Sequence, residues 1–176
     1  MKKILLFVLV FILGSFTFLS AEVKIGVFDL QKIMIMSDAG KDIKSMLEKK
    51  KAYYQKIIKQ KESQLKKMKE EIEKKAIMLS DTAKQEKEME YQRKLRELKL
   101  YASDSENELK QLYATKTQKL IHDILKVARD YAKKNKFTIL IERQEGGIVY
   151  FSKTIDVTNE ILKEYNDFYK KQKENQ

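Results

Sequence analysis

The stretch SAEVKIGVFDLQKIMIMSDAGKDI, residues 20–43, contains the change of pattern that decides the fold. Residues 23–30 place apolar side chains on both faces, which predicts a short strand that is buried on both sides. A helical turn is expected next, around residues 33–36, and Ser37 or Asp38 can cap the helix that follows. A single buried strand therefore leads directly into a long, charged helical region.

Two long helices are predicted after this strand, and they form an arm over residues 39–135. Apolar residues recur every seven positions from Ile58 to Leu79, a narrow stripe that suits one partner helix. The segment SDTAKQ interrupts the stripe, and its Thr82 and Gln85 have the spacing of a capping box. We therefore expect a helical hairpin with its tip near residues 80–82.

The segment FTILIERQEGGIVYFS, residues 137–152, predicts a β-hairpin. Apolar side chains alternate before Gly146-Gly147, and this glycine pair supplies the turn. Residues 148–151 are then the return strand. Together with the first strand, the hairpin gives a small antiparallel sheet and an α+β fold.

The predicted body is discontinuous, since residues 22–38 and 136–170 build it around the arm. Its last helix should begin at Asp156 or Thr158, and residues 171–176 should fray. So small a core usually needs disulfides, metals or oligomerisation. Because the chain has no cysteine and no visible metal cluster, we expect the body to be an oligomerisation hub. Its candidate contact residues are Ile25, Val27, Phe28, Ile139, Ile141, Val149 and Phe151.

Residues 1–21 have the pattern of a secretion signal. Lys2 and Lys3 precede the unbroken apolar run ILLFVLVFIL, which is long enough for a signal peptide and too short to span a bilayer. Ala21 offers a small residue at the cleavage position, so the mature chain would begin at Glu22. An uncleaved signal anchor is the alternative.

No set of residues has the spacing of a catalytic site. His122 is the only histidine, and its place in a helical run favours a partly exposed side chain over a catalytic base. The sequence contains no HExxH motif, no glycine-rich phosphate loop and no nucleophile elbow. We expect no enzymatic activity, no cofactor and no metal.

Positive charge is concentrated on the first helix of the arm. The chain has a net charge of +11, and residues 41–75 contain thirteen lysines against six acidic residues. Such a surface attracts anionic partners or lipid headgroups, and an ordinary solvated helix face is the alternative. The candidate electrostatic contacts are Lys49, Lys50, Lys66, Lys67 and Lys69.

Methionines near the tip of the arm are candidates for weak apolar contacts. Their flexible, polarizable side chains suit surfaces that accept many partners. The candidates are Met68, Met78 and Met89. For Met68, packing between the two helices is the favoured alternative.

Three segments of the sequence resemble the Skp/OmpH-type periplasmic chaperones. They are KIGVFDLQKI with the following SDAGK, the tip segment SDTAKQEKEMEYQR, and FTILIERQEGGIVYFSKTIDVTNEIL near the end. The resemblance implies a jellyfish-shaped homotrimer in the periplasm, with a β body and three helical arms around a cavity. It also implies that unfolded outer-membrane β-barrel proteins are held in this cavity without ATP.

The same resemblance implies part of a lipopolysaccharide site. Some members of the family are described as binding lipopolysaccharide through a lysine and paired arginines on the second arm helix. Aligned through the tip segment, Lys99 stands at the lysine position and Lys110 at one arginine position, whereas Leu109 occupies the other. Anionic lipid or lipopolysaccharide is therefore a candidate partner on a partial match.

Two other functions are compatible with the residue pattern. An exported coiled-coil spacer would need a dense heptad repeat, and Lys61 and Lys75 interrupt this one. A basic membrane-surface binder would depend on net charge alone. Nucleic acid is not an expected partner, because no aromatic or arginine platform accompanies the lysines. The resemblance favours the chaperone.

Overall fold

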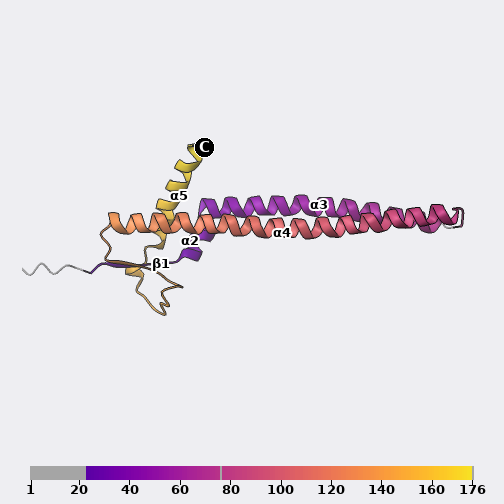
Figure 1. Ribbon diagram of the computed structural model, residues 1–176. Helices are drawn as coiled ribbons and strands as arrows, with labels where there is room; N and C mark the ends of the chain where they lie inside the picture. Colours follow the sequence, from indigo (N-terminus) through magenta and orange to yellow (C-terminus); the bar gives the residue numbers. More distant parts are fainter. Residues whose placement is uncertain (1–22, 76, 176) are drawn as a thin grey trace, which may run out of the picture.

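The chain consists of a small body and a long helical arm (Figure 1). The computed structural model describes residues 23–75 and 77–175, so the predicted signal peptide lies outside the described residues. In chain order the elements are β1 (Ile25–Phe28), α2 (Leu30–Met36), α3 (Asp38–Lys75), α4 (Asp81–Lys134), β2 (Ile139–Glu142), the 3-10 helix η1 (Lys153–Ile155) and α5 (Thr158–Glu174).

The arm is formed by α3 and α4, which lie side by side in opposite directions (Figure 1). The helices contain 38 and 54 residues, which correspond to about 57 Å and about 81 Å at 1.5 Å per residue. The additional length of α4 carries it into the body. The helical hairpin expected from the sequence is therefore present, and Leu65 of the predicted stripe is buried in it.

Ser80, rather than Thr82, caps the second arm helix. Its side-chain oxygen accepts a hydrogen bond from the amide of Ala83 at 3.3 Å, and α4 begins at Asp81. An acidic residue in the first turn is favourable at the positive end of the helix dipole. The predicted capping box was thus two residues too late, because three adjacent side chains in the SDT sequence can all cap a helix.

The sheet has two parallel strands, which corrects the antiparallel sheet predicted from the sequence. β1 pairs with β2 in a register that runs from Ile25 opposite Ile139 to Phe28 opposite Glu142. Parallel strands need a long crossover connection, and α2, α3 and α4 together provide it. On its other edge, β1 forms a single bridge between Val27 and Asp156.

Residues 148–151, predicted as the return strand, are not a strand. The chain does turn at Gly147, which has a φ of +62°, a conformation that glycine adopts easily. Beyond this turn Val149 is fully exposed and Tyr150 is 86% exposed. A strand here would bury little apolar surface within one chain, so little offsets the entropy cost of ordering it.

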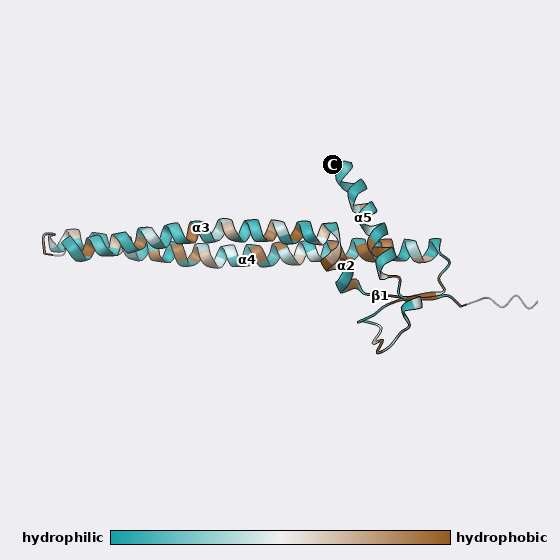
Figure 2. Ribbon diagram, turned by 180° about the vertical axis from the view of Figure 1, so that it is seen from behind, coloured by the Kyte–Doolittle hydropathy of each residue, from teal (hydrophilic) through white to brown (hydrophobic). Residues whose placement is uncertain are grey.

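The hydrophobic core lies where α2, α4 and α5 meet beside the sheet. Figure 2 shows apolar residues concentrated there, whereas the arm is largely hydrophilic. Ile33, Ile124, Ile161 and Tyr165 are at most 2% exposed and belong to this core. Since α2 and α5 come from opposite ends of the described chain, the body depends on both.

Two of the residues predicted for oligomerisation are internal to the single chain. Val27 is 1% exposed and Phe28 is 4% exposed, so they stabilise the body from within and present little surface to a partner. Ile25, Ile139 and Val149 are exposed, and Ile141 and Phe151 are half-buried.

Helix α5 connects the body to the base of the arm. Asp156 accepts a hydrogen bond from the amide of Thr158 at 2.9 Å, and the Thr158 hydroxyl accepts one from the amide of Asp29 at 3.0 Å. The helix continues to Glu174, through residues that were predicted to fray. Within this last stretch, Lys173 donates a hydrogen bond to Asp42 of α3 at 3.0 Å.

The junction between α2 and α3 is tightly packed. The Ser37 hydroxyl accepts a hydrogen bond from the amide of Gly40 at 3.1 Å, as expected of a capping residue. A Cβ atom on Gly40 would lie 1.8 Å from the carbonyl oxygen of Met34. Glycine is therefore required where the arm leaves the body.

Candidate functional site

The five candidate lysines of α3 do not form one continuous surface. Lys49, Lys66, Lys67 and Lys69 are exposed, whereas Lys50 is half-buried. Lys49 and Lys67 are separated by about five helical turns and therefore share a face, but Lys66 and Lys69 fall on other faces. The exposed lysines thus give the helix a positive potential around much of its circumference.

Lys50, Tyr54 and Glu108 form a polar contact between the two arm helices, which we call the cross-arm cluster. The Glu108 carboxylate accepts hydrogen bonds from Lys50 Nζ and from the Tyr54 hydroxyl, the latter at 2.5 Å. The bond from Lys50, followed by that from Tyr54, lowers the pKa of Glu108. The bonds to Glu108 in turn raise the pKa values of Lys50 and Tyr54.

Aromatic side chains pack beside the cross-arm cluster. Tyr54 is 8% exposed and meets Tyr101 edge-on, with 6.1 Å between the ring centroids. Lys61 Nζ lies 5.6 Å from the centre of the Tyr101 ring, a favourable cation–π distance. Lys61, which interrupts the predicted apolar stripe, therefore contributes to pairing of the helices.

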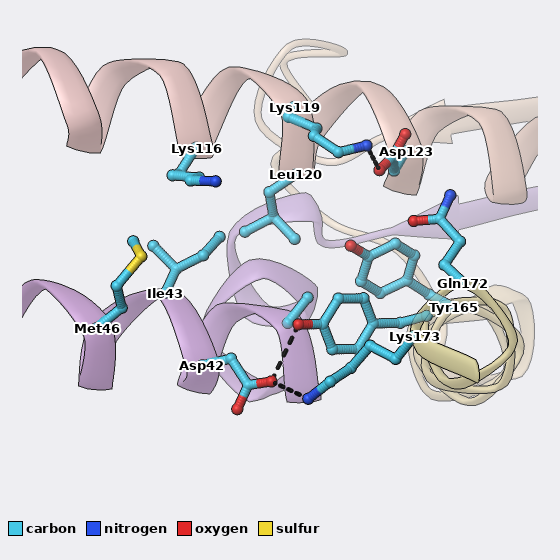
Figure 3. Close-up of a pocket in the computed structure, with 12 residues that line it drawn as sticks. Asp42, Ile43, Met46, Lys116, Lys119, Leu120, Asp123, Tyr165, Gln172 and Lys173 are labelled. Carbon is cyan, nitrogen blue, oxygen red and sulfur yellow. Dashed lines mark hydrogen bonds and ion pairs between the residues drawn. The ribbon is translucent and has the colours of Figure 1, made fainter. Parts of the chain in front are cut away.

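Asp42, Tyr169 and Lys173 join α5 to α3, and we call them the arm-base contact. Figure 3 shows Asp42 and Lys173 in this contact. Asp42 accepts hydrogen bonds from the Tyr169 hydroxyl and from Lys173 Nζ, both at 3.0 Å. The bond from Lys173, then that from Tyr169, lowers the pKa of Asp42. The contact borders a pocket of about 390 Å³, which Tyr165 also lines, and burial raises the pKa of Tyr165 well above its usual range.

Apolar side chains are exposed at the tip of the arm. Met78 is 86% exposed and Met89 is 57% exposed, while Met68 is half-buried. Ile77 is 97% exposed and is a further apolar contact that the sequence reasoning missed. Its signal was its position beside Met78, at the end of the stretch that the sequence pattern assigns to the first arm helix.

A groove of about 740 Å³ lies at the base of the arm, and we call it the basal groove. Residues of α2, α3 and α4 line it at the base of the arm. Its apolar lining includes Ile35, Leu47, Leu109 and Tyr113, and its basic lining consists of Lys41, Lys44, Lys51 and Lys110. The sequence reasoning missed this groove because its lining comes from three elements, and no single helical stripe reveals it.

The two residues of the partial lipopolysaccharide match lie on α4. Lys99 and Lys110 are separated by about three helical turns, or roughly 16 Å, and therefore share a face. Lys110 Nζ lies 2.7 Å from Glu106, and this bond lowers the pKa of Glu106. Leu109 and Lys110 also line the basal groove. Lipopolysaccharide binding stays a prediction.

Neither a metal cluster nor a membrane span is found among residues 23–75 and 77–175. In this part of the chain no three histidine, cysteine or acidic side chains gather so as to hold a metal ion. Its helices are also too short or too polar to cross a bilayer. His122 is exposed on α4.

The chain has a small body of mixed secondary structure, and this body carries a two-helix arm. This arrangement is the fold of the OmpH-like proteins. The chain belongs to the OmpH-like family, because residues 24–165 match the family model described as "Outer membrane protein (OmpH-like)". The match extends from β1 into α5, so it includes the body as well as the arm.

Two known proteins illustrate the relationship. An OmpH-like protein from Caulobacter crescentus CB15, assigned as an outer membrane chaperone, superimposes with a TM-score of 0.77 over 82% of this chain and 84% of its own, at 11% sequence identity. An uncharacterised protein from Aquifex aeolicus (strain VF5) is 28% identical over 135 residues, which cover 77% of this chain and 78% of that one. The first similarity concerns the fold alone.

Proposed function

We propose that this OmpH-like protein is an ATP-independent holdase that binds unfolded outer-membrane proteins and prevents their aggregation. The observation that carries the proposal is the family match, which spans body and arm. The arm also suits such a role, because its long surface combines exposed lysines with scattered exposed apolar residues. Unfolded membrane β-barrel strands present alternating apolar side chains and unpaired edges, which aggregate unless they are shielded.

The holdase is proposed to act as a homotrimer whose arms surround the bound chain. Support comes from the body, where Ile25, Ile139, Val149 and Tyr150 expose apolar surface in the single chain. Ile25 and Ile139 lie opposite each other in the sheet, and exposed apolar surface of this kind is typical of a protein–protein interface. The periplasm is the proposed location, with residues 1–21 as a cleavable signal, and release of the bound chain is proposed to occur without ATP.

The proposed function is tested with the chain from Glu22 and a urea-denatured outer-membrane β-barrel protein. On dilution, the barrel protein should remain soluble in a complex of three chains to one client, as determined by mass measurement of the same sample. Aggregation of the client in the presence of an intact oligomer would contradict the holdase function and favour a structural spacer.

The contribution of positive charge is tested by reversing Lys49, Lys66, Lys67 and Lys69 to glutamate. Lys50 is left intact because it belongs to the cross-arm cluster. We expect weaker client binding and a shallower salt dependence, since surface charges act through a screened field. The matched control reverses four exposed lysines outside the arm, Lys136, Lys153, Lys163 and Lys170. Equal effects of the two sets would exclude a specific role for the arm lysines.

A further inference from the structure

We infer that the pocket between α5 and the base of the arm binds a small amphipathic anion, with one carboxylate-like group on a short apolar body. We call it the arm-base pocket, and its walls include Ile43 of α3, Leu120 of α4 and Tyr165 of α5. The inferred ligand is a free small molecule and not a polypeptide. The inference therefore goes beyond the proposed holdase function and does not depend on it.

The size and walls of the pocket suit one small molecule with an apolar part. Its volume is about 390 Å³, within the range of about 300–1,000 Å³ that is typical of small-molecule sites. Ile43 and Met46 from α3 and Leu120 from α4 supply apolar side chains to the lining. Because three helices meet here, a molecule in this pocket contacts the body and both helices of the arm.

The Tyr165 hydroxyl is a polar group at this pocket that has no partner among the residues lining it. Tyr165 is 2% exposed, and Figure 3 shows its hydroxyl pointing toward Leu120, with no dashed line to any of the residues drawn. Within residues 23–75 and 77–175, no fully buried side-chain nitrogen or oxygen lacks a hydrogen bond. The small exposed part of Tyr165 therefore includes its hydroxyl, which the pocket makes accessible to a ligand.

This hydroxyl needs an acceptor. Burial raises the pKa of Tyr165 well above its usual range, so the hydroxyl keeps its proton and can donate it. A donor that is removed from bulk water without a partner costs free energy. An acceptor oxygen on a bound molecule would remove this cost.

The charged side chains of the pocket also leave a donor over. Asp42 pairs with Lys173 at 3.0 Å, and Asp123 pairs with Lys119 at 3.0 Å. Lys116 is the third lysine of the lining, and in Figure 3 no dashed line joins it to another residue drawn. The lining thus has two acidic side chains against three lysines, and both acidic side chains are already paired.

This donor excess selects an anion. A carboxylate can accept a hydrogen bond from the Tyr165 hydroxyl, while Lys116, on its flexible four-carbon stem, supplies the opposite charge. Figure 3 shows Leu120 between these two side chains, where it can contact the apolar body of the ligand. A neutral amide would keep the hydrogen bond but lose the charge interaction, and a cation would meet the excess positive charge.

The experiment compares three probes that share one apolar chain and differ in charge: octanoate, octanamide and octylammonium. Isothermal titration calorimetry with the full chain measures the affinity of each. We expect octanoate to bind with one molecule per chain, octanamide to bind about tenfold more weakly, and octylammonium to bind more weakly still. No binding of octanoate, or equal affinities for octanoate and octanamide, would overturn the inference.

Two substitutions locate the site. Tyr165→Phe removes only the hydroxyl, and Lys116→Gln removes the charge of an exposed side chain. Each should weaken octanoate binding by about tenfold. Because the Tyr165 hydroxyl has no partner in the lining, Tyr165→Phe should also keep the Tm of the parent without ligand, and octanoate should raise this Tm less than it raises that of the parent.

The matched controls are Tyr113→Phe and Lys56→Gln. Both residues are exposed, and neither lines the arm-base pocket. The controls should bind octanoate with the affinity of the parent, which would separate this pocket from general adsorption to the arm. Parent affinity in either Tyr165→Phe or Lys116→Gln, or an equal loss in the controls, would overturn the inference.

Discussion

Gly40 and Gly26 occupy positions where a single methyl group would force neighbouring atoms apart. At Gly40 the added carbon would lie 1.8 Å from a backbone oxygen of Met34. At Gly26 it would lie 2.8 Å from the ring of Phe137 and 3.0 Å from Leu140. Side chains can move away from such a contact more easily than a backbone carbonyl can, so the two sites should differ in tolerance.

Gly40→Ala should therefore be the more destabilising of the two substitutions. Overpacking typically costs about 1–3 kcal/mol, and we expect Gly26→Ala in this range and Gly40→Ala at or above its upper end. In an unconstrained helix, alanine would instead add up to about 1 kcal/mol of stability over glycine. Urea unfolding followed by circular dichroism gives both free energies. A stabilised Gly40→Ala protein would show that α2 and α3 do not approach closely.

Among the elements, the arm helices depend on the cross-arm cluster for part of their pairing. The pKa of Glu108 is lowered in the folded chain, so its ionised form stabilises the arm above its ordinary pKa of 4.5. This contribution is lost as the pH falls through the lowered value. We expect Glu108→Gln to have a lower Tm than the parent at pH 7, and the two Tm values to converge below pH 4.5.

Thermal unfolding by circular dichroism at a series of pH values measures this difference. Glu73→Gln is the matched control, because Glu73 faces Lys69 at 3.9 Å within the exposed part of α3. Exposed pairs of this kind contribute little, so the control should follow the parent at every pH. A Tm loss in Glu108→Gln that is the same at all pH values would show that the charge of Glu108 is not its cause.

The sequence was sufficient to predict the arm, and the reason lies in its local pattern. The heptad spacing from Ile58 to Leu79 and the break at residues 80–85 are signals within single elements. The direction of β2 was not predictable in this way, because alternation along a strand looks the same for parallel and antiparallel pairing. The cross-arm cluster was also invisible, since Tyr54 and Glu108 are 54 positions apart.

At the level of the whole molecule, the exposed apolar residues of the body should be covered in the proposed trimer. Val149 is fully exposed, so Val149→Asp should not disturb the single chain but should introduce a charge into the interface. We expect its mass in sedimentation equilibrium to shift toward that of the single chain. Ile77→Asp, a change at the 97% exposed tip residue, is the control and should keep the mass of the parent. An unchanged mass for Val149→Asp would place this loop outside the interface.

The parallel pairing of β1 with β2 has a consequence for the order in which the chain folds. Lys24 and Thr138 are hydrogen-bonded beside the sheet although 114 positions separate them, and contacts this distant form slowly when the intervening chain is disordered. The arm removes most of that delay, because α3 and α4 can pair progressively from the short turn at their tip. Once they are paired, their bases lie together and the sheet closes as if across a short loop. The body is therefore expected to fold last. The edges of β1 and β2 that pair with each other stay unpaired until α3 and α4 have formed the arm.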